Sequence, residues 1–124
     1  MSRETKRRWR DYRTAAGRRP IKEFIDGLSD VDAAAVVAAM KDVRETGLVL
    51  ARHLRGEIYE VRADGGNRTF RILFATEGRF SHVLLSLVAF VKKTQKTPPR
   101  ELTLAEHRLK DWRARGTARR ARKH

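Results

Sequence analysis

Cysteine is absent from this chain of 124 residues, so it can form no disulfide, thiolate nucleophile or cysteine zinc site. No apolar run approaches the roughly 20 residues that a membrane span needs, and the arginine-rich start is not followed by an apolar signal region. No spacing of His, Asp or Glu indicates a metal site, and no glycine-rich loop suits a nucleotide. We therefore expect a soluble, cytoplasmic protein with no membrane partner, metal or cofactor.

Acidic residues are also scarce: 15 Asp and Glu face 29 Lys and Arg, which gives a formal charge of +14 and a pI near 11.3. Such a charge on a small protein creates a field that favours polyanions. Nucleic acid, or a machine built on nucleic acid, is therefore the leading class of partner. The charge does not distinguish RNA from DNA, or binding from catalysis.

The length and the 40% hydrophobic content fit one domain that spans residues 1–124 and buries a single core. No internal repeat and no linker divides it. We expect an ordered core of about residues 6–115, followed by a basic tail at 117–124 that is frayed or solvated.

The order of elements predicts an α+β fold. We expect an edge strand within 5–13, a short helix that starts at Pro20, a helix over 30–46, strands over 57–63, 69–75 and 80–91, and a last helix that ends near Gly116. Residues 48–56 show no period and are expected to form a link. This order, strand, two helices, three strands and helix, predicts a small antiparallel sheet with helices packed on one face.

The hairpin of residues 57–75 places arginines on one surface. In its second strand Phe70, Ile72 and Phe74 alternate with Arg71, so we expect Arg71 to leave the sheet on the face away from the aromatic side chains. By the same alternation, Arg62 and Glu60 share that face.

The stretch from Phe80 to Pro99 changes from the most apolar run of the chain to the polar cluster KKTQKT at 92–97. It is typical of a buried strand that carries cations to the edge of the fold, where a rigid element can position a phosphate. The alternative is that Lys92, Lys93 and Lys96 only solvate the place where the strand leaves the core.

With these segments in view, the sequence resembles the RelE/ParE toxin superfamily, and within it the HigB-like, phage-derived branch. The resemblance rests on the segments RPIKEFIDGL, HLRGEIYEVR, TFRILF and FVKKTQKTP, with the last followed by a helix that opens RELTLAEHR. They occur in family order and cover most of the chain, from about Trp9 to Trp112. FVKKTQKTP is the most specific of them.

The resemblance implies a RelE-like fold and the toxin of a type II toxin–antitoxin pair. Such ribosome-dependent endoribonucleases cut mRNA in the ribosomal A site, and a cognate antitoxin, often a helix-turn-helix protein encoded nearby, silences them. Two features depart from better studied members. Those members carry lysines on the strand that matches residues 58–62, where this chain has Tyr59, Glu60 and Arg62. Some of them also have a C-terminal catalytic tyrosine, which has no counterpart here because Tyr12 and Tyr59 are the only tyrosines.

Cleavage of RNA without a metal needs attack by the 2′-hydroxyl, two proton transfers and stabilisation of negative charge on the phosphate. Because an arginine fork is the best phosphate clamp, Arg71 is the first candidate for that role and Arg62 the second. The alternative for Arg71 is an ion pair with Glu60 or Glu57. Lys93 and Lys96 are the candidate lysines, since like-charged neighbours lower the pKa of an ammonium group.

Further cations and polar groups are candidate contacts to mRNA or ribosomal RNA, with phosphate binding that weakens in salt. They are Lys92, Arg68, Thr94, Gln95, Arg55, Arg7, Arg8 and Arg10. His53 and Glu60 are alternative acid–base groups. The residues do not decide which group moves protons.

Two other functions remain open. One is inhibition of DNA gyrase, as in the ParE branch, which needs no RNA-cutting site. The other is plain binding of nucleic acid. The gathering of cations in FVKKTQKTP, together with Arg71, favours the nuclease over both.

Overall fold

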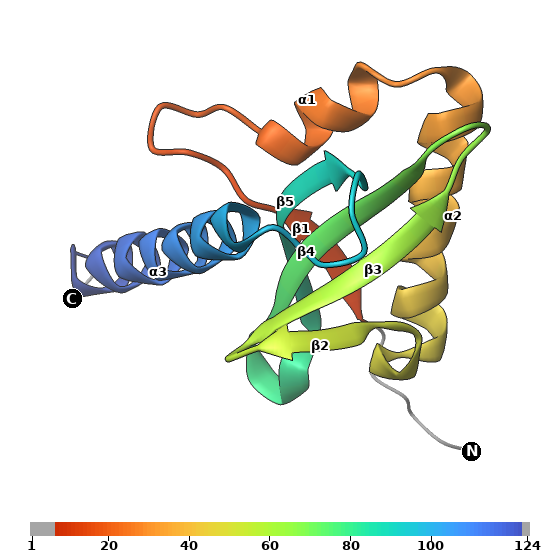
Figure 1. Ribbon diagram of the computed structural model, residues 1–124. Helices are drawn as coiled ribbons and strands as arrows, with labels where there is room; N and C mark the ends of the chain where they lie inside the picture. Colours follow the sequence, from red (N-terminus) through yellow and green to blue (C-terminus); the bar gives the residue numbers. More distant parts are fainter. Residues whose placement is uncertain (1–6, 123–124) are drawn as a thin grey trace.

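Residues 7–122 are described by the computed structural model, and they form a five-stranded sheet with three α-helices (Figure 1). The elements are β1 (Arg8–Asp11), α1 (Pro20–Asp26), α2 (Asp30–Thr46), η1 (Leu48–Leu50), β2 (Arg52–Arg55), β3 (Ile58–Asp64), β4 (Thr69–Glu77), η2 (Arg79–Ser81), β5 (Val83–Val91) and α3 (Pro99–Arg122). The α+β class is confirmed. Within the described part, no helix is long and apolar enough to cross a membrane.

The sheet has the strand order β1-β5-β4-β3-β2, and it is mixed rather than wholly antiparallel. β1 runs parallel to β5, with Arg8 beside Val83, while all other neighbours are antiparallel. Parallel pairing is possible because the two helices between β1 and the rest of the sheet provide a long crossover. The prediction of a purely antiparallel sheet was therefore wrong in this one strand pair.

β2 forms the second edge of the sheet, in the segment that was expected to be a link. Its sequence RHLR shows no alternation of apolar and polar residues, and three of its four residues are exposed. Antiparallel pairing with β3 makes it a strand, with a bulge between His53 and Arg55. The pairing is a tertiary contact that no local pattern announces.

α2 begins and ends where the sequence predicted. The Ser29 side chain accepts a hydrogen bond from the Asp32 backbone N–H (3.2 Å) and caps the helix, and Gly47 follows its last residue with φ +112°. Val36 and Val43 are fully buried against the sheet. α1 starts at Pro20, as expected for a residue that needs no N–H in the first turn.

Helices cover both faces of the sheet. One core cluster joins Val36 and Val43 of α2 to the aromatic side of β4, and the other joins Ala105 and Leu109 of α3 to the opposite side. In Figure 1, α2 and α3 accordingly lie on opposite sides of the strands. The prediction of helices on one face was wrong because β5 is apolar on both sides, and its second apolar side needed a cover.

A bulge in β5 changes which face its side chains occupy. Leu73 of β4 pairs with Val88 and Phe74 pairs with Ser86, so Leu87 is an extra residue on β5. The Leu87 carbonyl accepts a hydrogen bond of 2.6 Å from Arg108 Nη1 of α3. α3 is thus fastened to the sheet at the irregular position.

α3 continues past Gly116, where it was expected to end, and reaches Arg122. Arg113 forms ion pairs with Glu57 (2.6 Å) and Glu77 (3.0 Å), and Arg115 pairs with Asp111 (2.8 Å). The Arg113 pairs hold α3 against the sheet just before Gly116, and a single glycine, which costs a helix about 1 kcal/mol, does not end it. Most of the predicted tail at 117–124 is therefore helical, and residues 123–124 lie outside the described part.

Candidate nucleic-acid interface

A polar pocket of about 450 Å³ opens where β4 begins and β5 ends. Phe70 of β4 pairs with Val91 of β5, so the residues just before one strand face those just after the other. The pocket is lined by Asn67, Arg68, Thr69, Lys92, Lys93, Thr94 and Gln95. The β4–β5 pairing therefore brings five of the predicted contact residues to one place, across more than 20 residues of chain.

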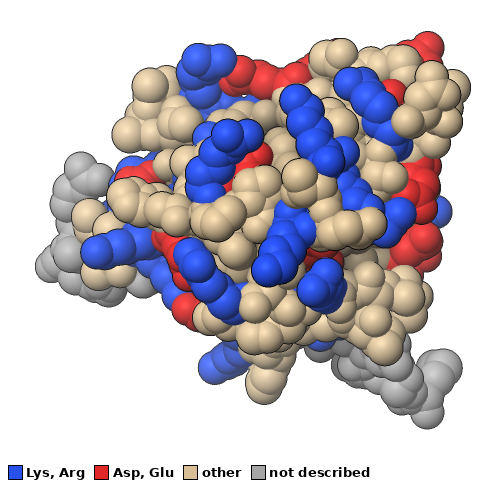
Figure 2. Space-filling model, viewed as in Figure 1, with Lys and Arg blue, Asp and Glu red and all other residues tan. Residues whose placement is uncertain are grey.

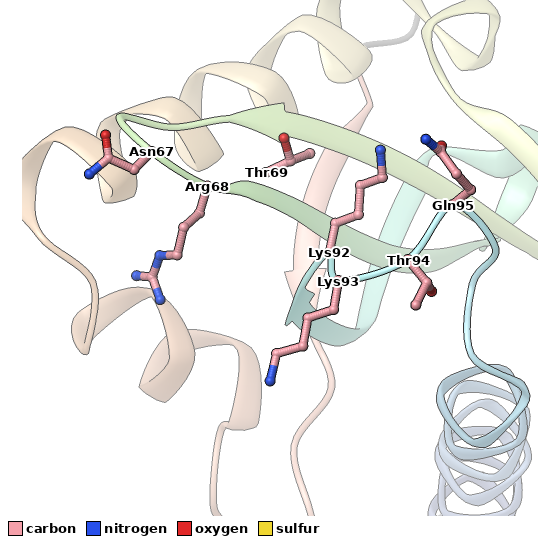
Figure 3. A pocket seen from close by; sticks show the side chains of 7 residues that line it. All are labelled: Asn67, Arg68, Thr69, Lys92, Lys93, Thr94 and Gln95. Carbon is pink, nitrogen blue, oxygen red and sulfur yellow. The ribbon is translucent and has the colours of Figure 1, made fainter.

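The cations of the pocket point to two sides of the strands. Figure 3 shows the Arg68 and Lys93 side chains extending to one side and Lys92 to the other. Neighbouring residues at the end of a strand alternate in this way. A strand of RNA that crosses this place meets positive charge on both sides of the backbone.

The two pocket lysines keep their charges available. Within residues 7–122, neither Lys92 nor Lys93 has a carboxylate within ion-pair distance, whereas Arg68 Nη2 lies 3.4 Å from Asp32 Oδ2 and stays half exposed. Ammonium groups with no carboxylate at ion-pair distance can bind phosphate without first breaking an internal salt bridge. The pocket is suited to an anion.

Asp32 of α2 fixes the turn that carries Arg68. Its Oδ1 accepts a hydrogen bond of 2.8 Å from the Gly66 backbone N–H, and its Oδ2 is the partner of Arg68. The Gly66 hydrogen bond and Arg68 hold the pKa of the Asp32 carboxyl below its usual value of 3.8. A helix on one face of the sheet thus sets the geometry of one wall of the pocket.

The shifted pKa of Asp32 predicts a dependence of stability on pH. Because the folded-state pKa is lowered, the ionised carboxylate stabilises the fold above the unfolded-state pKa, and this contribution is lost as the pH falls through the folded-state value. Asp32→Asn, which keeps an acceptor for Gly66, is expected to be less stable than the wild type at neutral pH. The gap should close as the pH falls below the usual aspartate pKa of 3.8 and through the lower folded-state value. Urea unfolding at a series of pH values measures it, and a gap that stays constant with pH would contradict this account.

Arg71, the first candidate for a phosphate clamp, lies inside the protein and not in the pocket wall. Its side chain is 4% exposed, and its Nε is 3.6 Å from Oε1 of Glu60, which is 6% exposed. Arg71 stands opposite Arg62 on β3, so the expectation that these three residues share a face is confirmed. In this arrangement Arg71 has the partner given above as the alternative, Glu60.

The Arg71 guanidinium holds the segment after β5. Arg71 Nη2 donates to the Gln95 carbonyl (2.8 Å) and Nη1 donates to Thr97 Oγ1 (3.3 Å), while the Thr97 hydroxyl donates to Glu60 Oε2 (2.7 Å). Arg71 Nε is buried and has no hydrogen-bond partner. The segment that lines one side of the pocket is thereby tied to two central strands.

Two further candidates lie near the pocket without lining it. Lys96 is exposed, and its carbonyl accepts a hydrogen bond from Thr94 Oγ1 (2.7 Å). Arg62 is exposed and pairs with Asp64 (3.3 Å). The Asp64 carboxylate also accepts from Thr69, a pocket residue, so Arg62 is one side chain away from the site.

The remaining arginine candidates are not brought to the pocket. Arg55 on the edge strand β2 pairs with Glu106 of α3 (2.7 Å). Arg7 donates to the Ser81 carbonyl at the opposite end of β5, and Arg8 and Arg10 lie on β1, with Arg10 over the Trp112 ring at 5.0 Å. Any contact that these residues make with RNA is separate from the pocket.

The alternative acid–base groups are also outside the pocket lining. His53 Nε2 lies 2.8 Å from the Gly56 carbonyl, to which it donates, and its ring packs on Tyr59. Glu60 is held by Thr97 and Arg71. Over the described residues, no group of three or more His, Asp or Glu is placed to hold a metal ion.

Charge is distributed unevenly over the surface. Figure 2 shows Lys and Arg spread over the face that presents the strands and α3, while Asp and Glu are more frequent along the margin where α2 runs. The first turn of α2 is acidic, with Asp30 and Asp32. A polyanion is therefore attracted to the sheet and its pocket more than to α2.

Sequence reasoning missed Asn67 and Thr69 as pocket residues, and Thr97 and Glu60 as the link between the pocket loop and the sheet. The hairpin register could have found the first two, since the turn before β4 must face the end of β5. No local signal identifies the second pair, because their contact joins residues 37 positions apart.

The structure is that of a small, basic α+β protein with a cationic pocket at the end of its central strands. The chain belongs to the family described as phage-derived protein Gp49-like, whose model matches residues 23–110. It is also 34% identical over 108 residues to proteins named "Probable endoribonuclease HigB1" from two strains of Mycobacterium tuberculosis, over 84% of this chain and 83% of each relative. The resemblance to the HigB-like branch is confirmed.

Proposed function

We propose that this protein is the toxin of a type II toxin–antitoxin pair, an endoribonuclease that cuts mRNA in the ribosomal A site without a metal ion. The observation that carries the proposal is the pocket, where Arg68, Lys92 and Lys93 surround a space of about 450 Å³. The name of the Mycobacterium tuberculosis relatives, "Probable endoribonuclease HigB1", supports the RNA-cutting part of the proposal.

The reaction needs a site for one phosphodiester. The 2′-oxygen attacks the adjacent phosphorus and loses its proton, the bond from phosphorus to the 5′-oxygen breaks, and that oxygen gains a proton. The products are a 2′,3′-cyclic phosphate and a 5′-hydroxyl. Lys93 and Arg68, which extend to the same side, stabilise the negative charge that grows on the phosphoryl oxygens, and Lys92 binds the backbone from the other side.

The other candidates have supporting roles in this proposal. Gln95 donates to RNA oxygens, and the Thr94 hydroxyl, whose proton goes to the Lys96 carbonyl, accepts from RNA. Lys96 and Arg62 bind the chain on either side of the cut, and Arg71 holds the loop. Ribosomal RNA contacts Arg55, Arg7, Arg8 and Arg10 through phosphates, with an affinity that falls as salt rises. The protein acts in the cytoplasm, where ribosomes are, and a cognate antitoxin of the helix-turn-helix type blocks it.

Loss of a pocket lysine is expected to slow cleavage. Each charge-assisted hydrogen bond contributes about 1.5–3 kcal/mol, so Lys93→Ala and Lys92→Ala should each lower the rate by about ten- to a hundredfold. Lys41→Ala on the exposed side of α2 is the matched control and should cleave like the wild type. The measurement adds purified protein to a translation reaction, maps new mRNA ends by primer extension and identifies the end groups of the products.

Two results would contradict the proposal. Intact mRNA on translating ribosomes with wild-type protein would exclude a ribosome-dependent nuclease, and a 5′-phosphate on the downstream product in place of a 5′-hydroxyl would exclude attack by the 2′-hydroxyl. Cleavage-complex formation in a DNA gyrase assay, in the absence of RNA cutting, would instead assign the protein to the gyrase-inhibiting branch.

A further inference from the structure

The segment between β5 and α3, residues 92–98, carries half of the pocket but has no regular secondary structure. Its position is set by a small number of contacts. The Lys92 backbone N–H donates to the Thr69 carbonyl (2.8 Å), and beyond that point the segment is held by Arg71 at the Gln95 carbonyl and by the Thr97 side chain. The last two contacts converge on one buried guanidinium.

The Thr97 hydroxyl is the shortest link between the two charges of the buried pair. Arg71 Nε and Glu60 Oε1 are 3.6 Å apart without a hydrogen bond, whereas Thr97 Oγ1 lies 2.7 Å from Glu60 Oε2 and 3.3 Å from Arg71 Nη1. An ionised carboxylate only accepts, so the hydroxyl proton goes to Glu60 and an oxygen lone pair accepts from Arg71. The hydroxyl thus joins Glu60 of β3 to Arg71 of β4 by two hydrogen bonds, whereas the two side chains form none directly.

We propose that Thr97 is a positioning residue of the pocket: its hydroxyl bridges Glu60 and Arg71 and so fixes the loop that presents Lys93, Thr94 and Gln95 to RNA. The inference rests on the proposed function and adds to it a residue that does not touch the substrate. The sheet fixes the position of the Arg71 guanidinium, which in turn holds the Gln95 carbonyl by a hydrogen bond. The Thr97 hydroxyl holds the guanidinium and the Glu60 carboxylate together.

The test compares Thr97→Val, which has nearly the same shape without the hydroxyl, with Thr97→Ser, which keeps it. Misplacement of a binding group by about 1 Å lowers turnover by up to a hundredfold. Thr97→Val is therefore expected to lower kcat on ribosome-bound mRNA by about ten- to a hundredfold while KM changes little, and Thr97→Ser is expected to restore most of it. Thr103→Val, at an exposed position of α3, is the matched control.

A second measurement reads the loop without any cleavage. Backbone ¹⁵N relaxation should show lower order parameters for residues 93–96 in Thr97→Val than in the wild type, Thr97→Ser and Thr103→Val. If Thr97→Val cleaves like the wild type, or if its loop keeps wild-type order parameters, the inference is wrong. If the wild type itself cleaves no mRNA, the proposed function fails, and the relaxation data still decide whether Thr97 positions the loop.

Thr97→Val also removes the hydrogen-bond donor of a buried carboxylate, so the variant can be too unstable to study. Thr97→Cys keeps both buried charges and offers the carboxylate a weak S–H donor in place of the hydroxyl, so it is expected to fold. It should cleave more slowly than Thr97→Ser. Turnover in Thr97→Cys equal to that of Thr97→Ser would show that the hydroxyl is not needed to place the loop, which would overturn the positioning role.

Discussion

Arg71→Met is expected to lower the free energy of unfolding by about 3–5 kcal/mol, because it leaves the Glu60 carboxylate buried without a cation. Both side chains are less than a tenth exposed, and the neighbouring Thr97 hydroxyl offers only one hydrogen bond. Urea denaturation followed by circular dichroism measures the change. The loss should be large enough to be seen as a lower denaturation midpoint.

Arg62→Met is the control for this prediction. Arg62 stands directly opposite Arg71 on β3 but is exposed and paired with an exposed carboxylate, so its replacement should change stability by no more than about 0.5 kcal/mol. The double variant Arg71→Met with Glu60→Leu removes both buried charges and should recover most of the loss. An Arg71→Met protein as stable as the wild type would contradict the view that Arg71 is part of the interior.

Gly65→Ala is expected to destabilise the protein by about 1–3 kcal/mol through overpacking, and to displace the turn that carries Arg68. A Cβ at Gly65 would lie 2.2 Å from Asp32 Oδ1 and 2.8 Å from Phe70 Cε2. Neither neighbour can yield, since the carboxylate is held by the Gly66 N–H and the ring is fully buried. The midpoint of thermal unfolding and the affinity for a short RNA oligonucleotide should both be lower than in the wild type.

The adjacent residue provides a matched comparison. A Cβ at Gly66 would have its nearest neighbours at 3.8 Å, which is an ordinary contact, so Gly66→Ala should leave stability and RNA binding close to those of the wild type. Equal effects of the two substitutions would show that loss of glycine flexibility in the turn, and not the contact with Asp32, decides the outcome.

Local patterns predicted the elements well where the chain itself carries the signal. Ser29 and Gly47 delimit α2, and the alternation of Phe70, Arg71 and Ile72 marks the start of β4. They did not predict β2, whose strand character comes only from pairing with β3, or the turns of α3 beyond Gly116. The first miss is a tertiary contact that overrides local propensity, and the second shows that one glycine, which costs a helix about 1 kcal/mol, is a weak stop signal.

For the candidate site, too, local patterns predicted some features and missed others. FVKKTQKTP identified the pocket loop, and the β4–β5 register adds Arg68 to it. The alternation that aims Arg71 away from the aromatic face is confirmed, but α3 and the loop of residues 92–98 cover that face, so the side chain is interior. Its catalytic role stays a prediction. An alternation pattern tells on which face a residue lies, and not whether that face is open.

The bulge at Leu87 determines on which side of the sheet Lys92 and Lys93 each lie. Before it, odd-numbered positions of β5 such as Leu85 face α3; after it, even-numbered positions such as Val88 and Phe90 do. Lys93 consequently lies beside Arg68, and Lys92 on the other side. In an unbroken strand the two would exchange places with no change in composition. Lys92 and Lys93 are therefore not interchangeable, because the extra residue Leu87 determines the side to which each of them points.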